Sequence, residues 1–363
     1  MEDIYFSKQK REEQQKEYNS QEFPDEIPVI YIPEDEAYTE PLPPEPPAPV
    51  KKKKKHKLLK TVLSIIIAVF LVVSVLISTV AFSSGYTRTD LKSNPYVNST
   101  QLTSSPFVTN ILLLGADGED GGSQRSDSIM LVSLDYLHGK IKLTSFLRDS
   151  WVYTPCKDAY HKLNSSYSYE GAQGVADTLE YNFGVKIDHF IKVDFEMFTQ
   201  LIDRLGGIDI EVTDKEAKFI TKTTRHTLES GKSVHLDGAK ALVYCRIRKL
   251  DSDYMRTQRQ RKVISALIGK IKNTSPLELV DIMQKVLPLL ESDLNAFEVT
   301  TLAYKGGFAA LFFDIQQIRI PTDDLMTTGY VGSNWVEKID VDGCKEKLYQ
   351  FIYTSYKEEL KEN

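Results

Sequence analysis

Residues 110–134 read NILLLGADGEDGGSQRSDSIMLVSL, two apolar runs on either side of an acidic, glycine-rich loop. A continuous apolar run such as Asn110–Gly115, stopped by Gly, is typical of a strand buried on both faces. Ser128–Leu134 is a second β-rich run, so we expect the loop to connect two strands at one end of a sheet. Asp117 and Asp127 then lie at strand ends, where they can face each other.

Alternating strand and helix patterns continue on the C-terminal side of this stretch. Strands are expected at Lys140–Phe146, His189–Val193, Ile208–Val212 and Gln317–Ile320. Apolar spacing and helix start or stop signals predict helices at Tyr169–Phe183, Phe195–Leu205, Met255–Ile271, Pro276–Leu290 and Asp342–Leu360. Such alternation favours an α/β layered domain with a largely covered sheet, and about 255 residues can support one large core.

An uncharged run lies on the N-terminal side, at residues 61–82, TVLSIIIAVFLVVSVLISTVAF. As a helix it would be about 33 Å long, enough to cross a hydrocarbon core of about 30 Å. Seven lysines within residues 51–60 precede it, so the positive-inside rule predicts a cytoplasmic N-terminus and an extracellular C-terminal domain. A cleaved signal peptide, with Thr79 and Ala81 near the cut, is the alternative, but the charged region and the apolar run are both too long for it.

Residues 1–50 contain 13 acidic and 4 basic side chains and nine of the 15 prolines of the chain. This composition predicts a disordered tail, and its sequence identifies no cytoplasmic partner.

The formal net charge of −6 leaves about −4 for residues 61–363, and a mildly acidic domain argues against nucleic-acid binding. We therefore expect a cytoplasmic tail at 1–57, a transmembrane helix at 58–82, an extracellular linker at 83–107 and a folded domain at 108–363.

The acidic loop between the first two strands is the first candidate site. Two carboxylates at strand ends, Asp117 and Asp127, can hold a hard cation such as Mg²⁺ or Mn²⁺ together with waters and phosphate oxygens. A Ca²⁺-binding EF-hand does not fit, because a loop that starts at Asp117 has Ser128 where the terminal Glu is required. A flexible acidic turn without a ligand remains the alternative.

The second candidate site is residues 246–261, RIRKLDSDYMRTQRQR, which hold five of the twelve arginines of the chain. Guanidinium groups match phosphate oxygens in pairs. Arg246 and Arg248 have the spacing of neighbours on one face of a strand, and Arg256 and Gln260 that of neighbours on one face of a helix. The four side chains could thus hold two adjacent phosphates.

Other interpretations of these residues stay open. The cluster can be a solvated basic face that Asp251 and Asp253 neutralise, which is the common outcome for a run of charges. Arg148 follows the strand that ends at Phe146 and is either a third phosphate contact or the ion-pair partner of Asp149.

The three cysteines would face the oxidising exterior. Cys245 ends the apolar run Ala241–Cys245 and is expected to be a buried free thiol. Cys156 and Cys344 are then the one pair to test for a disulfide.

Four sequence motifs follow one another along the chain. They are NILLLGAD at 110–117, RSDSIMLVSLD at 125–135, SFLRDSWV at 145–152 and RIRKLDSDYMRTQRQRKVI at 246–264. With the span upstream, this order resembles the LytR-CpsA-Psr family, and the resemblance covers Val108 to Leu360. It implies a central mixed β-sheet flanked by helices (α/β/α) and an apolar tunnel for a lipid. Candidates for the tunnel lining, with core packing as the alternative, are Val193, Phe195, Phe198, Leu201, Ile264 and Leu267.

Members of this family are phosphotransferases of mainly Gram-positive envelopes. The resemblance implies transfer of a glycan phosphate polymer, of the teichoic acid or capsule type, from a polyprenyl pyrophosphate carrier to peptidoglycan at the outer face of the plasma membrane. By motif, Asp117 and Asp127 would bind Mg²⁺ beside the pyrophosphate. The residues expected to surround or support the pyrophosphate are Arg125, Arg148, Arg246, Arg248, Arg256 and Gln260.

The residues and the resemblance lead to one hypothesis. The arginines and Mg²⁺ hold a diphosphate diester, a muramyl hydroxyl attacks the sugar-side phosphorus, and polyprenyl phosphate leaves. The expected catalytic residues are Asp127, Asp117, Arg148 and Arg248, and one of the two acids could accept the hydroxyl proton. Three other functions stay open: a non-catalytic protein that binds the lipid-linked glycan, an envelope regulator, and a polyprenyl pyrophosphate hydrolase.

Overall fold

The computed structural model describes residues 78, 79, 82, 83, 85–116, 125–248, 250 and 253–354. The chain divides into two units, Met1–Leu58 and Leu59–Asn363, and every described residue belongs to the second. The expected cytoplasmic tail, most of the expected span and Asp117 lie outside the described residues. Among the helices that the structure does describe, none is long and apolar enough to cross a membrane.

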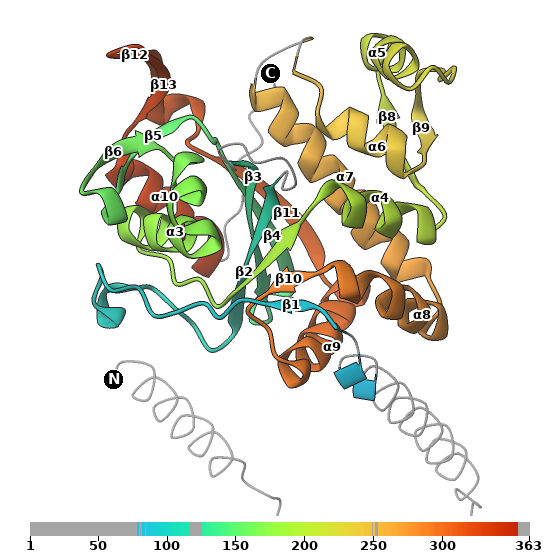
Figure 1. Ribbon diagram of the computed structural model, residues 1–363, viewed down its shortest axis with the longest axis horizontal. Helices are drawn as coiled ribbons and strands as arrows, with labels where there is room; N and C mark the ends of the chain where they lie inside the picture. Colours follow the sequence, from blue (N-terminus) through green and yellow to red (C-terminus); the bar gives the residue numbers. More distant parts are fainter. Residues whose placement is uncertain are drawn as a thin grey trace, which may run out of the picture. The chain divides into compact units, whose positions relative to one another are not determined.

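A mixed seven-stranded sheet forms the middle of the domain, in the order β1-β10-β7-β2-β3-β4-β11 (Figure 1). Its strands are β1 (Thr87–Arg88), β2 (Val108–Ala116), β3 (Ser126–Asp135), β4 (Lys140–Phe146), β7 (His189–Val193), β10 (Glu291–Ser292) and β11 (Asp314–Ile320). β2, β3 and β4 are antiparallel neighbours, whereas β7 runs parallel to β2 and β11 parallel to β4. The parallel partners are reached through helices, which come to lie on the faces of the sheet.

Helices cover both faces of this sheet (Figure 1). On one face lie α3 (Ser165–Phe183) and α10 (Val341–Tyr353), and on the other α7 (Asp253–Asn273) and α9 (Ala296–Phe312). Alternate residues of β2 serve the two cores: Leu112 and Leu114 pack with α3 and α10, and Ile111 packs with α7 and α9. The expected mixed sheet flanked by helices is confirmed.

A third core holds the remaining helices together. It joins α4 (Phe195–Arg204), α5 (Asp214–Thr224), α6 (Gly238–Cys245) and α8 (Pro276–Val286) with the hairpin of β8 (Ile208–Val212) and β9 (Gly231–Leu236). α7 contributes Val263 and Leu267 to this core and Ile268 to the core under the main sheet. α7 therefore ties the helical group to the sheet.

A second, four-stranded sheet is formed by strands that come after β4 in the sequence. Its order is β12 (Met326–Val331), β13 (Asn334–Ile339), β5 (Ser150–Thr154) and β6 (Ala159–Lys162). Part of the expected extracellular linker also belongs to the folded domain, because β1 pairs with β10 and Thr103 forms a bridge with Val185. The short strands involved carry too few residues to show an apolar pattern in the sequence.

Two expectations from the sequence are wrong in detail. Arg246 and Arg248 are not on a strand, because α6 continues to Cys245 and the two arginines lie in its connection to α7. The disulfide considered for Cys156 and Cys344 does not form, since both thiols are free. Cys245 is buried and free, as expected.

A buried ion pair ties the β3–β4 hairpin to the end of α10. The side chains of Lys142 and Asp135 are 1% and 0% exposed, and Nζ lies 2.7 Å from Oδ2. The same ammonium group donates to the carbonyl oxygens of Ile352 and Thr354 at 2.9 and 3.0 Å. Burial disfavours the carboxylate form of Asp135, but hydrogen bonds from Lys142 and His138 outweigh burial and lower its pKa.

Replacing Lys142 by Met should lower the free energy of unfolding by about 3–5 kcal/mol, because the Asp135 carboxylate would stay buried without its cation. Lys140→Met, on the same strand, is the matched control. The Asp314 partner of Lys140 is 81% exposed, so its loss should cost less than about 1 kcal/mol. Urea unfolding measures both values, and equal losses would contradict a special role for the buried pair.

Candidate functional site

Asp127 reaches the site through an irregularity in the pairing of β2 with β3. Gly115 pairs with Ser128 and Ala116 with Ser126, so Asp127 is an extra residue in β3. Such a bulge redirects a side chain and is common beside functional sites. Gly115 permits the close pairing, since a Cβ there would lie 2.9 Å from the Cβ of Ser128. The bulge lets the Asp127 carboxylate contact residues of other elements.

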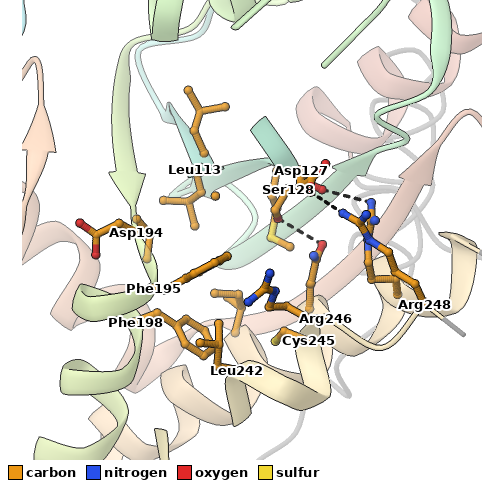
Figure 2. Close-up of a pocket in the computed structure, with 17 residues that line it drawn as sticks. Leu113, Asp127, Ser128, Asp194, Phe195, Phe198, Leu242, Cys245, Arg246 and Arg248 are labelled. Carbon is orange, nitrogen blue, oxygen red and sulfur yellow. Dashed lines mark hydrogen bonds and ion pairs between the residues drawn. The ribbon is translucent and has the colours of Figure 1, made fainter. Parts of the chain in front are cut away.

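Two arginines from distant parts of the chain hold the Asp127 carboxylate, and Figure 2 shows the contact with one of them, Arg248. Arg148, in the turn after β4, donates from Nη1 to Oδ1 at 2.6 Å, and Arg248, between α6 and α7, donates from Nη2 to Oδ2. Arg256, in the first turn of α7, donates to the main-chain oxygen of Asp127 at 3.1 Å. Asp127 thus connects β3, the end of β4 and the start of α7.

Asp253, the first residue of α7, is a second acid in this cluster. Its carboxylate lies 2.9 Å from Nη2 of Arg256 and 3.7 Å from Nε of Arg148. Arg148 also pairs with Asp149, which in turn pairs with Lys162 at 2.8 Å. The ion pair of Arg148 with Asp149 therefore exists beside its contact with Asp127, and cations alternate with acids across the cluster.

Burial and charge act in opposite directions on these groups. Burial disfavours the carboxylate form of Asp127, but Arg148 and Arg248 outweigh burial and lower its pKa. Burial lowers the pKa of Arg256 to about 10, while Asp253 favours its charged form. At neutral pH Asp127 is therefore an anion and a weak proton acceptor, and Arg256 is a cation.

A cavity with one polar and one apolar wall opens beside the cluster (Figure 2). The polar wall consists of Asp127, Ser128, Arg246, Arg248, Arg256 and Gln260, and Asp194 also lines the cavity. The apolar wall includes Leu113, Met130, Val193, Phe195, Phe198, Leu242 and Ile264. The walls meet where the Arg246 guanidinium lies 4.2 Å from the centre of the Phe195 ring. A ligand with an anionic head and an apolar body matches both walls.

The structure brings most of the expected site residues together. Asp127, Arg246, Arg248, Arg256 and Gln260 line the cavity, and Arg148 contacts Asp127. Arg125 is exposed just before β3 and is not one of the residues that line the cavity. Asp117 lies outside the described residues.

The candidates for an apolar tunnel divide into two groups. Val193, Phe195, Phe198 and Ile264 line the cavity. Leu201 and Leu267 pack in the third core instead. For these two, core packing was the correct interpretation.

Sequence reasoning did not name as site residues eight of the 17 residues that line the cavity, and Ser128 and Leu242 are two of them. Ser128 lies two residues before Met130 on β3, so both side chains line the cavity from the same face of the strand, and the bulge brings Asp127 beside them. The hydroxyl of Ser128 donates to Oε1 of Gln260 at 3.1 Å. Leu242 belongs to the apolar run Ala241–Cys245, which was not predicted to be part of a helix, although the eight residues of α6 include it.

Ligands for a metal ion are few in the described part of the chain. No group of three or more His, Cys, Asp or Glu side chains there lies close enough to hold one. Asp127 is ionised and its side chain is 51% exposed at the cavity, so it can supply one hard oxygen ligand. Mg²⁺ is often bound by one or two carboxylates together with phosphate oxygens and waters. Of the two acids expected to bind Mg²⁺, the structure describes Asp127, and both of its carboxylate oxygens accept hydrogen bonds from arginines.

Replacing Arg248 by Gln should raise the pKa of Asp127 towards its ordinary value of about 3.9, because one cation that favours the carboxylate is lost. The stability from this pairing is present at neutral pH and is lost as the pH falls through the lowered pKa. An NMR titration of ¹³C-labelled aspartate carboxyl groups measures the shift. Lys162→Gln, which removes a cation bonded to Asp149, should leave Asp127 unchanged; an equal shift would show that overall charge sets the pKa.

Comparison with known proteins relates the chain to one family. The model of the LytR-CpsA-Psr family matches residues 73–348. The polyisoprenyl-teichoic acid–peptidoglycan teichoic acid transferase TagU of Bacillus licheniformis is 34% identical over 184 residues, 50% of this chain and 58% of TagU. The chain thus spans little more than half the length of this relative.

Solved structures share the fold. TagT bound to LIIa-WTA has a TM-score of 0.59 at 25% identity, over 70% of this chain and 96% of that one. TagT with bound octaprenyl pyrophosphate lipid has a TM-score of 0.57 at 22% identity, over 73% and 99%. The match of the family model to residues 73–348 shows that the chain belongs to the LytR-CpsA-Psr family.

Proposed function

We propose that the chain is a phosphotransferase that moves a glycan phosphate polymer, of the teichoic acid or capsule type, from a polyprenyl pyrophosphate carrier onto peptidoglycan. The observation that carries the proposal is the cavity with an arginine-rich wall facing an apolar wall. A polyprenyl pyrophosphate has an anionic head and an apolar chain that match these walls. The name of TagU pairs a polyisoprenyl-linked teichoic acid with peptidoglycan, and TagT has been solved with octaprenyl pyrophosphate.

The arginines would hold the diphosphate. Arg256 lines the cavity and is 2% exposed, and its buried Nε and Nη1 have no hydrogen-bond partner in the described part of the protein, so their hydrogen-bonding capacity is unused there. Arg148 and Arg248 are held apart from each other by the Asp127 carboxylate between them. The cations are thus positioned before a substrate arrives, which reduces the cost of ordering them in the reaction.

The reaction breaks a phosphoanhydride bond of the diphosphate and forms a phosphate ester bond to the acceptor. The hydroxyl oxygen of a muramyl residue attacks the phosphorus that carries the glycan, and the bond from that phosphorus to the bridging oxygen of the diphosphate breaks. Polyprenyl phosphate leaves with the electron pair, and the hydroxyl proton passes to water. Arg148, Arg248 and Arg256 stabilise the negative charge on the transferred group and on the leaving group.

Magnesium is the proposed cofactor. Asp127 would hold it, together with Asp117 from outside the described residues. The ion would supply additional positive charge next to the diphosphate.

We also propose that residues 58–82 anchor the chain in the plasma membrane with the folded domain outside, because a lipid-linked donor and peptidoglycan meet there.

Replacing Asp127 by Asn or Arg248 by Gln should lower the transfer rate at least about 100-fold, because each change removes a charge that positions or neutralises the diphosphate. The assay uses the full chain and follows label from a polyprenyl pyrophosphate-linked glycan to peptidoglycan oligomers. Lys262→Gln is the matched control on α7: Lys262 pairs with Glu211 at 3.2 Å, and its side chain is 39% exposed.

The control should keep its rate within about twofold, since an exposed ion pair contributes little. Full activity in both the Asp127 and the Arg248 variant would contradict the proposal. Label released to water without transfer to the acceptor would indicate hydrolysis instead.

Removing divalent cations with EDTA should stop transfer, and added Mg²⁺ should restore it, because the diphosphate would lose part of its charge neutralisation. The Mg²⁺ concentration that gives half of the maximal rate should rise in Asp127→Asn and stay unchanged in Lys262→Gln. Transfer that continues unchanged in EDTA would exclude the metal.

A further inference from the structure

A second face of α7 is directed away from the cavity. Arg256, Gln260 and Ile264 follow one another at intervals of four residues and line the cavity. Ser265, on a different face, accepts a hydrogen bond at 2.8 Å from Nε2 of Gln317 on β11. Arg261 precedes Ser265 by four residues, one helical turn, and so faces β11 as well.

A second buried arginine, Arg319, is close enough to Arg261 to lower its pKa. Arg319 lies two residues after Gln317 on β11 and therefore on the same face of the sheet. The ring centre of Tyr254, seven residues before Arg261 on α7, lies 4.5 Å from the Arg319 guanidinium. Ser145 on β4 is the register partner of Arg319 and shares its face. Arg261, Arg319 and Ser145 thus gather between α7 and the β4–β11 pair; we refer to these three residues as the β11 cluster.

Five donor atoms of the β11 cluster are buried and have no partner among the described residues. Arg261 and Arg319 are each 6% exposed, and Ser145 is 1% exposed. Within the described residues, Nε and Nη1 of both arginines and Oγ of Ser145 have no hydrogen-bond partner. Buried polar groups in folded proteins almost always have one, so five donor atoms without a partner in one place point to a missing ligand.

Nearby acids neutralise this cluster only in part. Nη2 of Arg319 donates to Asp323 at 2.6 Å. The Asp323 side chain is 83% exposed, so solvent screens its negative charge and it neutralises the buried arginines only weakly. Burial, Asp149 and Asp253 raise the pKa of Glu337, and Arg319 opposes this shift only in part. The Oε2 atom of Glu337 is buried and, among the described residues, has no hydrogen-bond partner. Burial lowers the pKa of Arg261 to about 10, and of the two groups that modify this, Tyr254 and Arg319, neither is a carboxylate.

We propose that Arg261, Arg319 and Ser145 form a second oxyanion site, separate from the cavity, that binds one phosphate group. Guanidinium groups and a hydroxyl are the donors that phosphate oxygens prefer. Water could satisfy the hydrogen bonds but would leave the charge of Arg261 unbalanced, whereas an anion does both. The phosphate can be free inorganic phosphate or a phosphodiester within a larger ligand. The site does not depend on the transfer reaction proposed above.

Calorimetric titration of the full chain with inorganic phosphate tests this site. All variants carry Arg248→Gln, which weakens phosphate binding at the cavity. We expect one remaining phosphate site, with a Kd that rises at least about tenfold in Arg261→Gln and in Arg319→Gln. Lys262→Gln, which removes the neighbouring cation on α7, should change the Kd less than about twofold. A Kd that is the same in Arg261→Gln, Arg319→Gln and Lys262→Gln would overturn the site.

Two additions keep the test decisive. Ser145→Ala removes one hydroxyl and little volume, so it should fold even if an arginine variant does not, and a Kd unchanged by it would also count against the site. Dimethyl phosphate identifies the source of the phosphate group. Competition by this diester supports a phosphodiester ligand, binding of inorganic phosphate alone supports free phosphate, and binding of neither compound overturns the proposal.

Discussion

The contact of the Asp127 carboxylate with Arg148 and Arg248 is the interaction on which the site depends. Without an anion between them, these two guanidinium groups and that of Arg256 would repel one another at the end of the sheet. The carboxylate offsets that repulsion and links three segments far apart in the sequence. Because the bulge in β3 places Asp127 beside the cavity, the same contact sets cations at the edge of an apolar space.

The three arginines of α7 contact different parts of the protein. Arg256 joins Asp127 and Asp253 at the cavity, and Arg259 donates from Nε to Glu216 of α5 at 2.7 Å and from Nη1 to a main-chain oxygen at 3.1 Å. Arg261 faces β11. Three arginines within six residues thus have three environments because successive side chains point about 100° apart around a helix. One arginine-rich motif therefore holds the helical group on the sheet and also supplies the site.

The sequence alone predicted the strands with the clearest apolar runs and the residues that its motifs share with the family. Lys140–Phe146 and His189–Val193 have the expected bounds: the first is buried along nearly all of its length, and the second is half-buried around Phe190. α9, at Ala296–Phe312, was missed because Gly306 and Gly307 resemble a stop signal, yet an Asn295 capping box and packing on both sides hold the helix. At the site, the motifs indicated which arginines belong together. They could not show the bulge at Asp127, which arises from the pairing of two strands and leaves no local mark in the sequence.

The central claim is that Asp127 organises arginines to receive a diphosphate at the mouth of an apolar cavity. A crystal structure of the full chain with a polyprenyl pyrophosphate tests it most directly. The account predicts phosphate oxygens bonded to Arg148, Arg248 and Arg256, and a prenyl chain in contact with Phe198 and Ile264. A diphosphate bound away from these arginines, or a prenyl chain outside the cavity, would contradict it.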